Sequence, residues 1–263
     1  TVTGGAGTDT LNLTNTLTLP DMSGIEKLVF KDFTMAGVDV STNEYSDITT
    51  VRMDNSTVVA STLTLGVGVA VELDDITGIN GALSIAGDKH TSSTVTLTDS
   101  GSSTHAIDLD FTSAKTTAVT IKESGTQASY ASIANTGAKA VTVTIDADGK
   151  GLTLEDVAVA TTIDASASTA AITLDSAINK LKFTGGSGGD TLNVDIADAA
   201  GKEMTLNFGT GDDKVSFTNL DAANTLLNSK VTIDGGAGTD TFSGEEALIA
   251  GLGDLSTANF AKK

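Results

Sequence analysis

The sequence contains no cysteine and no tryptophan, and it has a single proline and a single arginine, Arg52. Without cysteine, the chain can form neither a disulfide framework nor a cysteine-ligated zinc site. Aromatic residues make up 4% of the chain, which leaves few flat rings for stacking against sugars or bases. No apolar run approaches the roughly 18 residues of a membrane span. No basic stretch followed by an apolar one indicates a signal peptide. With 28 glycines, this composition disfavours an ordinary globular enzyme and membrane insertion.

Negative charge dominates the sequence, with 34 Asp and Glu against 15 Lys and Arg and a formal net charge of -19. This balance argues against nucleic acid as a partner, because phosphate binding needs a basic surface. So many carboxylates weaken a compact fold by mutual repulsion unless counter-ions lie within it. Bound divalent cations would resolve that conflict.

The length of 263 residues suits one large domain or two smaller ones. The chain starts at Thr1 without Met, and its first nine residues already belong to a turn motif. We therefore expect a fragment of a larger protein. No Pro/Ser-rich linker divides the chain, so we expect one continuous structure over residues 1–263, with the turn motifs described below densest in residues 185–243.

Short segments in which apolar and polar residues alternate recur along the whole chain. Alternation with period 2, rich in Thr and Val, predicts half-buried β-strands, and the Gly, Asp, Asn and Ser clusters between them predict turns. One helix is expected, over residues 245–252, ended by Gly251 and Gly253. The expected strands are residues 11–19, 94–98, 118–121, 141–145, 172–174, 192–196, 204–208, 215–217 and 231–233.

Regularly spaced short strands fit either a β-sandwich or a solenoid. Residues 161–166, Thr-Thr-Ile-Asp-Ala-Ser, are echoed ten residues later by Ala-Ile-Thr-Leu-Asp-Ser in residues 171–176. We interpret this echo as stacked rungs, which bury small apolar side chains against their neighbours and expose Thr, Asp and Lys. The predicted fold class is all-β, a parallel β-solenoid with β-roll-like stacked rungs and calcium-binding Gly-Asp turns.

The strongest motif is the nonapeptide Gly-Gly-x-Gly-x-Asp-x-apolar-x. Three copies fit throughout, in residues 4–12, 185–193 and 235–243, and a fourth in residues 208–216 lacks only the first Gly. Glycine can adopt the left-handed dihedrals that direct successive carbonyls to one point. The Asp adds an anionic oxygen, and the apolar residue begins the next strand. A turn without metal, in which Asp caps backbone amides, is the alternative reading of any one copy.

Carbonyl and carboxylate oxygens are the ligands that calcium prefers, in sets of six to eight at about 2.3–2.6 Å. Magnesium fits less well, because it demands a strict octahedron and keeps its waters. We therefore predict several Ca²⁺ ions, each held by carbonyls of one turn and an Asp of the turn stacked beside it. The predicted metal-site residues are Gly5, Gly7, Asp9, Gly186, Gly188, Asp190, Gly209, Gly211, Asp212, Asp213, Asp234, Gly236, Gly238 and Asp240.

On these four motifs the sequence resembles the RTX proteins, calcium-binding repeat proteins secreted by Gram-negative bacteria. The resemblance implies type I secretion and folding in extracellular calcium. RTX toxins carry the nonapeptide in tandem, whereas here Asp190, Asp213 and Asp240 lie 23 and 27 residues apart. Each copy would then mark one turn of a longer rung. Candidates for the partner turn are Asp195, Asp198, Asp212 and Asp234.

The sparse spacing, with the Thr/Ala-rich segments 23–30, 75–87 and 161–176, is similar to the surface-layer (S-layer) proteins of this group. That resemblance implies a two-dimensional lattice of identical subunits on the bacterial surface. It also implies attachment to lipopolysaccharide through a part of the parent protein outside this chain. The leading hypothesis is therefore a structural, non-enzymatic S-layer segment. The alternatives are an RTX adhesin segment that extends from the cell, and a β-helical polysaccharide lyase, whose basic groove is hard to build with one arginine.

Weaker patterns have ordinary explanations. Asp146-Ala147-Asp148-Gly149 is similar to the start of an EF-hand loop, but Val157 stands where the closing Glu belongs. No Gly-x-Ser-x-Gly elbow is present. We expect solvated positions for the remaining acidic pairs, Thr-x-Thr runs and histidines, namely Asp74-Asp75, Asp108 and Asp110, Thr14 to Thr18, Thr94 to Thr98, His90 and His105.

Overall fold

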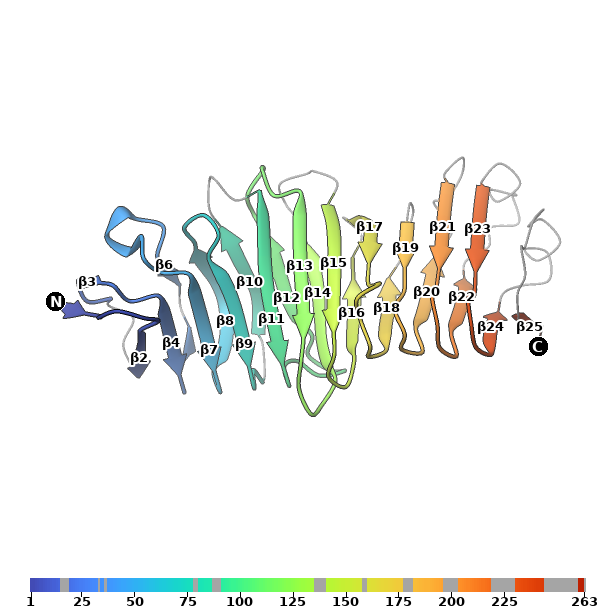
Figure 1. The fold of residues 1–263 in the computed structure, drawn as a ribbon, viewed down its shortest axis with the longest axis horizontal. Helices are drawn as coiled ribbons and strands as arrows, with labels where there is room; N and C mark the ends of the chain where they lie inside the picture. The colour runs from blue at the N-terminus through green and yellow to red at the C-terminus, as the bar shows by residue number, and fades with distance from the viewer. Residues whose placement is uncertain are drawn as a thin grey trace.

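The structure is a computed structural model that describes residues 1–14, 19–32, 34–35, 37–77, 80–86, 91–134, 141–157, 160–176, 182–195, 203–218, 230–243 and 260–262. Over these residues the chain is a β-solenoid, long in one direction, with the two termini at opposite ends (Figure 1). The 3-10 turn η1 (Asn43–Tyr45) is the one helical element in the described part. The predicted all-β, parallel solenoid is confirmed. The helix expected over residues 245–252 lies outside the described residues.

Two long parallel sheets form the walls of the solenoid. A separate two-stranded sheet pairs β1 (Val2–Thr3) with β3 (Met22–Ser23). The 11-stranded sheet contains, in order, β2 (Thr10–Thr14), β4 (Lys27–Lys31), β7 (Thr50–Asp54), β9 (Ala70–Asp74), β11 (Ser92–Thr98), β13 (Ala118–Glu123), β15 (Val141–Ala147), β17 (Ala160–Asp164), β19 (Lys182–Thr184), β21 (Glu203–Asn207) and β23 (Lys230–Asp234). The 12-stranded sheet contains β5 (Thr34–Met35), β6 (Val38–Asp39), β8 (Thr57–Thr64), β10 (Asn80–Ala86), β12 (Ile107–Phe111), β14 (Ser129–Ala134), β16 (Leu152–Asp156), β18 (Ile172–Ser176), β20 (Thr191–Asp195), β22 (Lys214–Thr218), β24 (Asp240–Ser243) and β25 (Phe260–Lys262).

Successive strands alternate between the two long sheets, so one strand of each makes a rung. β17 pairs with β15 and β19 in the 11-stranded sheet, and β18 pairs with β16 and β20 in the 12-stranded sheet. The echoed segments 161–166 and 171–176 therefore lie on opposite sheets of one rung. The interpretation of this echo as two stacked rungs is wrong. One rung contains a strand in each sheet, and both strands alternate apolar and polar residues, so the two segments of one rung look alike in sequence.

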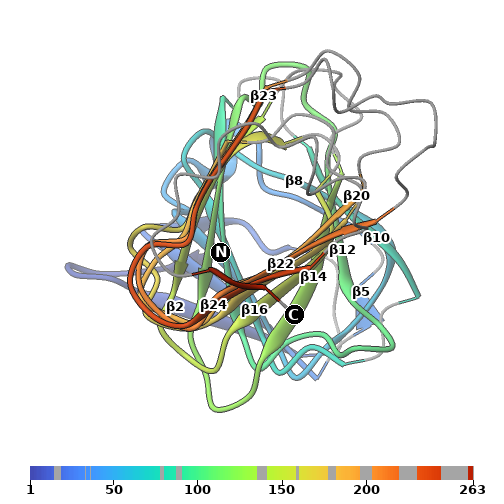
Figure 2. The ribbon, with the colours of Figure 1, turned by 90° about the vertical axis from the view of Figure 1, so that its right-hand side faces the viewer.

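The core lies between the sheets and consists mainly of Val, Ile and Leu. Figure 2 looks along the stack of rungs, and the strands of the two sheets superimpose as two walls. Inward positions such as Val143, Ile163 and Leu174 are fully buried, and their register neighbours in the next rung are apolar too. Parallel sheets with strands in register produce such columns of like side chains. Each predicted strand segment overlaps a strand, but the segment 11–19 is a strand only as far as Thr14, with residues 15–18 outside the described part, and β21 ends at Asn207, one residue before the predicted end.

Phenylalanine side chains enter the core along the whole stack, at Phe30, Phe111, Phe183 and Phe208 among others, and they pair toward the C-terminal end. The rings of Phe183 and Phe208 lie 5.5 Å apart between centroids, as do those of Phe217 and Phe242. Among the described residues, no helix is long and apolar enough to cross a bilayer.

Candidate metal centre

Three of the four motif copies stack on one edge of the solenoid, where the chain passes from the 11-stranded to the 12-stranded sheet. We call this the motif edge; it runs along the bottom of Figure 1. Residues 185–190 follow β19, residues 208–213 follow β21, and residues 235–240 follow β23. The strands before and after these turns pair in register from rung to rung. The motif positions therefore coincide, although the rungs differ in length.

Asp190, Asp213 and Asp240 form a continuous ladder, which we call the aspartate column. The N–H of Asp190 donates to Oδ1 of Asp213 at 2.6 Å, and the N–H of Asp213 donates to Oδ1 of Asp240 at 3.1 Å. The N–H of Ile172 donates in the same way to Oδ1 of Asp190 at 2.9 Å. Oδ1 of each carboxylate thus accepts a backbone N–H of the preceding rung. At this corner it takes the place of a carbonyl acceptor from a neighbouring strand.

The other oxygen of each carboxylate in the aspartate column is unpaired. The three residues are 0–1% exposed, and their Oδ2 atoms are buried without a hydrogen-bond partner. A buried acceptor without a partner costs on the order of 1–3 kcal/mol, and more when it is charged. The chain alone therefore leaves three costly oxygens in successive turns.

Burial raises the pKa of Asp190 to about 7 and that of Asp213 to about 6. Repulsion by Asp213 adds to the rise at Asp190, while Asp240 and Asp212 add to the rise at Asp213. The causes are desolvation and like charge, and a bound cation would oppose both.

Glycines let the three turns approach closely. A Cβ atom on Gly236 would overlap the carbonyl oxygen of Gly209, one on Gly209 that of Gly186, and one on Gly186 that of Ser168. Gly236 and Gly209 also have φ of +78° and +85°, which other residues rarely adopt. A second column behaves alike, because a Cβ on Gly238 would overlap the carbonyl of Gly211, and one on Gly211 would press against that of Gly188.

Backbone hydrogen bonds hold these turns in register. The N–H of Thr210 donates to the carbonyl of Gly186 at 2.9 Å, and the N–H of Ala237 donates to that of Gly209 at 3.0 Å. A carbonyl oxygen has two lone pairs, so each can still face a cation. The same turns thus contain both the stacked glycine carbonyls and the carboxylates with an unpaired oxygen.

This donor set fits a hard cation. Calcium accepts backbone carbonyls and carboxylates in a flexible geometry, and a unit charge is best buried when paired. In the described part of the chain no three His, Asp or Glu side chains meet at one point. A cation here would therefore draw most ligands from the glycine carbonyls, with the aspartate column supplying charge.

The partner-turn candidates have other surroundings. Asp212 is exposed, and its Oδ1 accepts the N–H of Thr239 at 2.8 Å. Asp234 is exposed and accepts the N–H of Gly236 at 3.0 Å, an Asx turn. Asp195 pairs with Thr218 within the 12-stranded sheet, and Asp198 lies outside the described residues. The neighbour of each motif turn is the next copy of the motif itself.

The N-terminal copy stands apart from the other three. It joins β1 to β2 and so leads into the 11-stranded sheet, at the opposite end of the stack (Figure 1). Oδ2 of the half-buried Asp9 accepts the N–H of Gly5 at 2.7 Å, and the N–H of Asp9 donates to Oε2 of Glu26 at 2.7 Å. Gly7 has φ of +114°. The structure therefore does not bring this copy together with the aspartate column.

Two carboxylates of the motif edge were not singled out by the sequence patterns. Glu123, 1% exposed, faces the core at the end of β13, and burial raises its pKa. Asp99 follows β11 with φ of +47°. An Asp or Glu that breaks the apolar alternation just before a Gly-containing turn is the signal that could have found Glu123.

The weaker candidates occupy ordinary positions. Asp146 lies 3.5 Å from Nζ of Lys122, and Asp148 accepts the hydroxyl of Thr169 at 3.0 Å. Thr94 is aligned with Thr120, but Thr96 is aligned with Lys122, so no uninterrupted Thr ladder forms there. Of the others, Asp74 is ion-paired with Arg52, Asp75 directly follows β9, Asp108 and Asp110 lie on β12, His105 is exposed, and His90 and Thr16 to Thr18 lie outside the described residues. The expected solvated position is wrong for Asp110, because its Oδ1 is buried without a hydrogen-bond partner.

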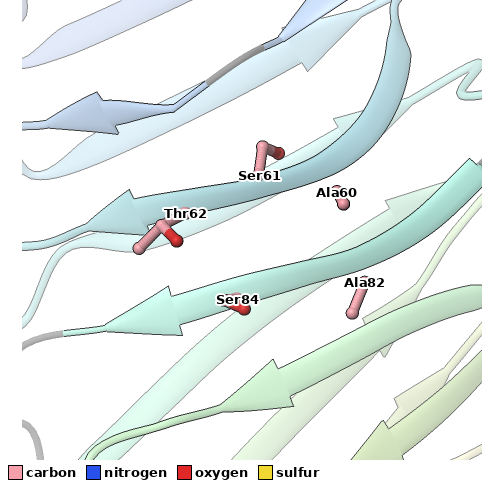
Figure 3. Close-up of a pocket in the computed structure, with 5 residues that line it drawn as sticks. All are labelled: Ala60, Ser61, Thr62, Ala82 and Ser84. Atoms are coloured by element: carbon pink, nitrogen blue, oxygen red, sulfur yellow. The ribbon is translucent and has the colours of Figure 1, made fainter.

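A shallow hollow of about 370 Å³ lies over β8 and β10 (Figure 3). Its lining is Ala60, Ser61, Thr62, Ala82 and Ser84, next to the point where the pairing of these strands shifts in register. These side chains offer hydroxyl and methyl groups and no group that titrates near neutral pH.

Comparison of the chain with protein-family models, with curated proteins and with solved structures returns no match. The case for a metal centre therefore depends on the geometry and chemistry just described.

The glycine columns lead to a test that needs no metal. Replacing Gly236 by alanine should lower the free energy of unfolding by about 1–2 kcal/mol, since the new Cβ meets the Gly209 carbonyl at a positive φ. Urea unfolding followed by circular dichroism measures this. The matched control is Gly5→Ala, where a Cβ has no atom within 4 Å. Equal effects of the two substitutions would contradict close stacking of the motif turns.

Proposed function

We propose that this chain is a calcium-binding structural segment of a bacterial cell-surface protein, and that it assembles with copies of itself into an S-layer lattice. The observation that carries the calcium part is the aspartate column, three buried carboxylates with an unpaired oxygen each, in closely stacked glycine turns. Calcium bound there would neutralise the column and cross-link successive rungs.

A structural role, rather than catalysis, is favoured by the way the residues are used. The acidic and glycine residues of the motif edge join one rung to the next through backbone bonds. The net charge of -19 is tolerated more easily when cations lie inside the fold. Together with the RTX resemblance, these features support secretion to a medium that contains calcium, with the chain as one part of a longer surface protein.

The lattice proposal predicts calcium-dependent assembly. With millimolar calcium, the purified chain should form ordered sheets visible by negative-stain electron microscopy, and a chelator should disperse them. The physical reason is linkage: ions that bind only the folded state stabilise it by about 2.7 kcal/mol at a hundredfold excess over Kd. Magnesium at equal concentration is the control for ionic strength.

The other outcomes separate the competing proposals. Calcium-induced β-structure that remains monomeric in solution would overturn the lattice and favour an adhesin segment. Identical circular dichroism and dispersion with calcium, magnesium and chelator would overturn the calcium site itself.

A further inference from the structure

The central turns of the motif edge hold their carboxylates differently from the aspartate column. Oδ1 of Asp99 accepts the N–H groups of Thr126 and Gln127, both at 2.7 Å, from the turn of the next rung. The hydroxyl of Thr126 lies 3.2 Å from Oδ2. Both oxygens are thus paired within the protein, and the amide of Gln127 lowers the pKa of Asp99.

Glu123 is the next carboxylate along this edge. Its Oε2 accepts the N–H groups of Gly149 at 3.1 Å and Gly151 at 3.4 Å. Its Oε1 is buried without a partner, but the residues aligned with Glu123 in the neighbouring strands are Leu97 and Ala147. No second carboxylate is therefore aligned with it in the sheet, and two amides compensate its charge, while the nearby Asp99 adds to the rise of its pKa caused by burial. In the aspartate column each Oδ1 accepts one amide, and for Asp213 and Asp240 that amide belongs to the preceding member, so the carboxylates themselves are stacked.

Buried serines complete the central corners. Oγ of Ser100 accepts the N–H of Ile76 at 3.2 Å, and Oγ of Ser129 accepts the N–H of Ser100 at 3.2 Å. Oγ of Ser168 accepts the N–H of Ala147 at 3.1 Å and donates to the carbonyl of Ile145 at 3.1 Å. The corner amides of Ile76, Ser100 and Ala147 are thus satisfied by uncharged side chains of the chain itself.

We infer that the solenoid has two differently stabilised parts: the rungs from β11 to β18 fold without calcium, and the rungs from β19 to β24 require it. This inference rests on the proposed calcium binding. The boundary lies where the N–H of Ile172 meets Oδ1 of Asp190, the first carboxylate of the aspartate column. Because each rung of a solenoid contacts only its neighbours, its parts can order separately. The central rungs then serve as the template on which calcium orders the C-terminal rungs.

Hydrogen exchange of the whole chain, analysed by mass spectrometry with calcium and with a chelator, tests this inference. Peptides within residues 92–176 should exchange at rates within about threefold of each other in the two conditions. Peptides within residues 182–243 should lose on the order of a hundredfold of their protection when calcium is removed, which is the factor set by a hundredfold excess of ligand over Kd.

The possible outcomes separate this inference from the proposed function. Equal loss of protection in both parts would overturn the two-part solenoid while leaving calcium binding in place. No change in either part would overturn both. Slower exchange confined to residues 182–243 in calcium supports both.

A pair of matched substitutions gives a second readout. Asp99→Asn weakens a charge-assisted hydrogen bond of the central part, and asparagine tolerates the positive φ at this position. It should speed exchange in residues 92–134 by the same factor with calcium and with chelator. Asp190→Asn should speed exchange in residues 182–243 when calcium is present and should not speed it in chelator, because it also removes a buried charge whose second oxygen has no partner. A calcium-dependent effect of Asp99→Asn would overturn the assignment of the central rungs.

Discussion

Replacing Asp213 by asparagine is expected to remove most of the calcium stabilisation while leaving the calcium-free chain at least as stable as before. Asparagine keeps an Oδ1 that can accept the N–H of Asp190, so the ladder can persist. It removes a buried charge whose second oxygen has no partner, which relieves the calcium-free state. In calcium, the same change deletes a charged ligand.

The expected size follows from linkage. If calcium at a hundredfold excess over Kd contributes about 2.7 kcal/mol, the variant should lose about 2 kcal/mol of that gain, read as the shift of the urea midpoint between calcium and chelator. The matched control is Asp175→Asn on β18, an exposed carboxylate that accepts Nδ2 of Asn193 at 3.2 Å. A full calcium response in the Asp213 variant would place the cation away from the aspartate column.

The stability of the chain should depend on pH with opposite signs in chelator and in calcium. Burial raises the pKa of Asp190 to about 7 and of Asp213 to about 6, from an ordinary value of 3.8. Between pH 4 and the raised values, the folded chain holds protons that the unfolded chain has released. Stability in chelator therefore falls as pH rises through this window, and it is greatest below about pH 4.

Calcium reverses that slope because it competes with protons for the same carboxylates. In calcium, stability should rise from pH 4 to pH 7, so the two curves cross. The expected change in chelator is about 2 kcal/mol for each carboxylate after allowance for screening by water, measured by urea unfolding at intervals of half a pH unit.

The double variant Asp190→Asn, Asp213→Asn controls the pH experiment. It should retain only the smaller slope from Glu123, whose pKa is also raised by burial. Asp99, whose pKa is lowered, acts below its ordinary value and so outside this window. Parallel curves with and without calcium in the original chain would show that protons and calcium use different groups.

The fold could be predicted from the sequence because the strands of both sheets must place apolar residues on the face toward the core. This requirement produces alternating apolar and polar residues in both strands of a rung. Segments such as residues 141–145 and 172–174 are strands because one face of each must be apolar, and the structure has them in β15 and β18. The same local rule misled the interpretation of the echo in residues 161–176, since both halves of one rung obey it. Sequence alone cannot say whether two similar strands stack or face each other.

The metal centre could be predicted in part. The motif identifies Asp190, Asp213 and Asp240 from sequence. Their burial and the hydrogen bonds between them could not be predicted, because both depend on the register of the strands. The N-terminal motif is as complete in sequence, yet Asp9 lies at the other end of the stack, because its position depends on which sheet the following strand joins. Glu123 belongs to no local motif. Its partner Gly149 lies in a turn 26 residues away, so nothing close to Glu123 in sequence marks its role.

The motif turns are equal in length, at residues 185–190, 208–213 and 235–240, although the rungs that contain them are not. The difference lies in the number of residues between consecutive strands: Asp195 ends β20 and Glu203 begins β21, whereas Thr218 ends β22 and Lys230 begins β23. Stacking constrains the length of the motif turns, whereas the number of residues between β20 and β21 and between β22 and β23 can vary. A foreign peptide inserted into the chain between β22 and β23 should therefore leave the stacked motif turns and the aspartate column undisturbed.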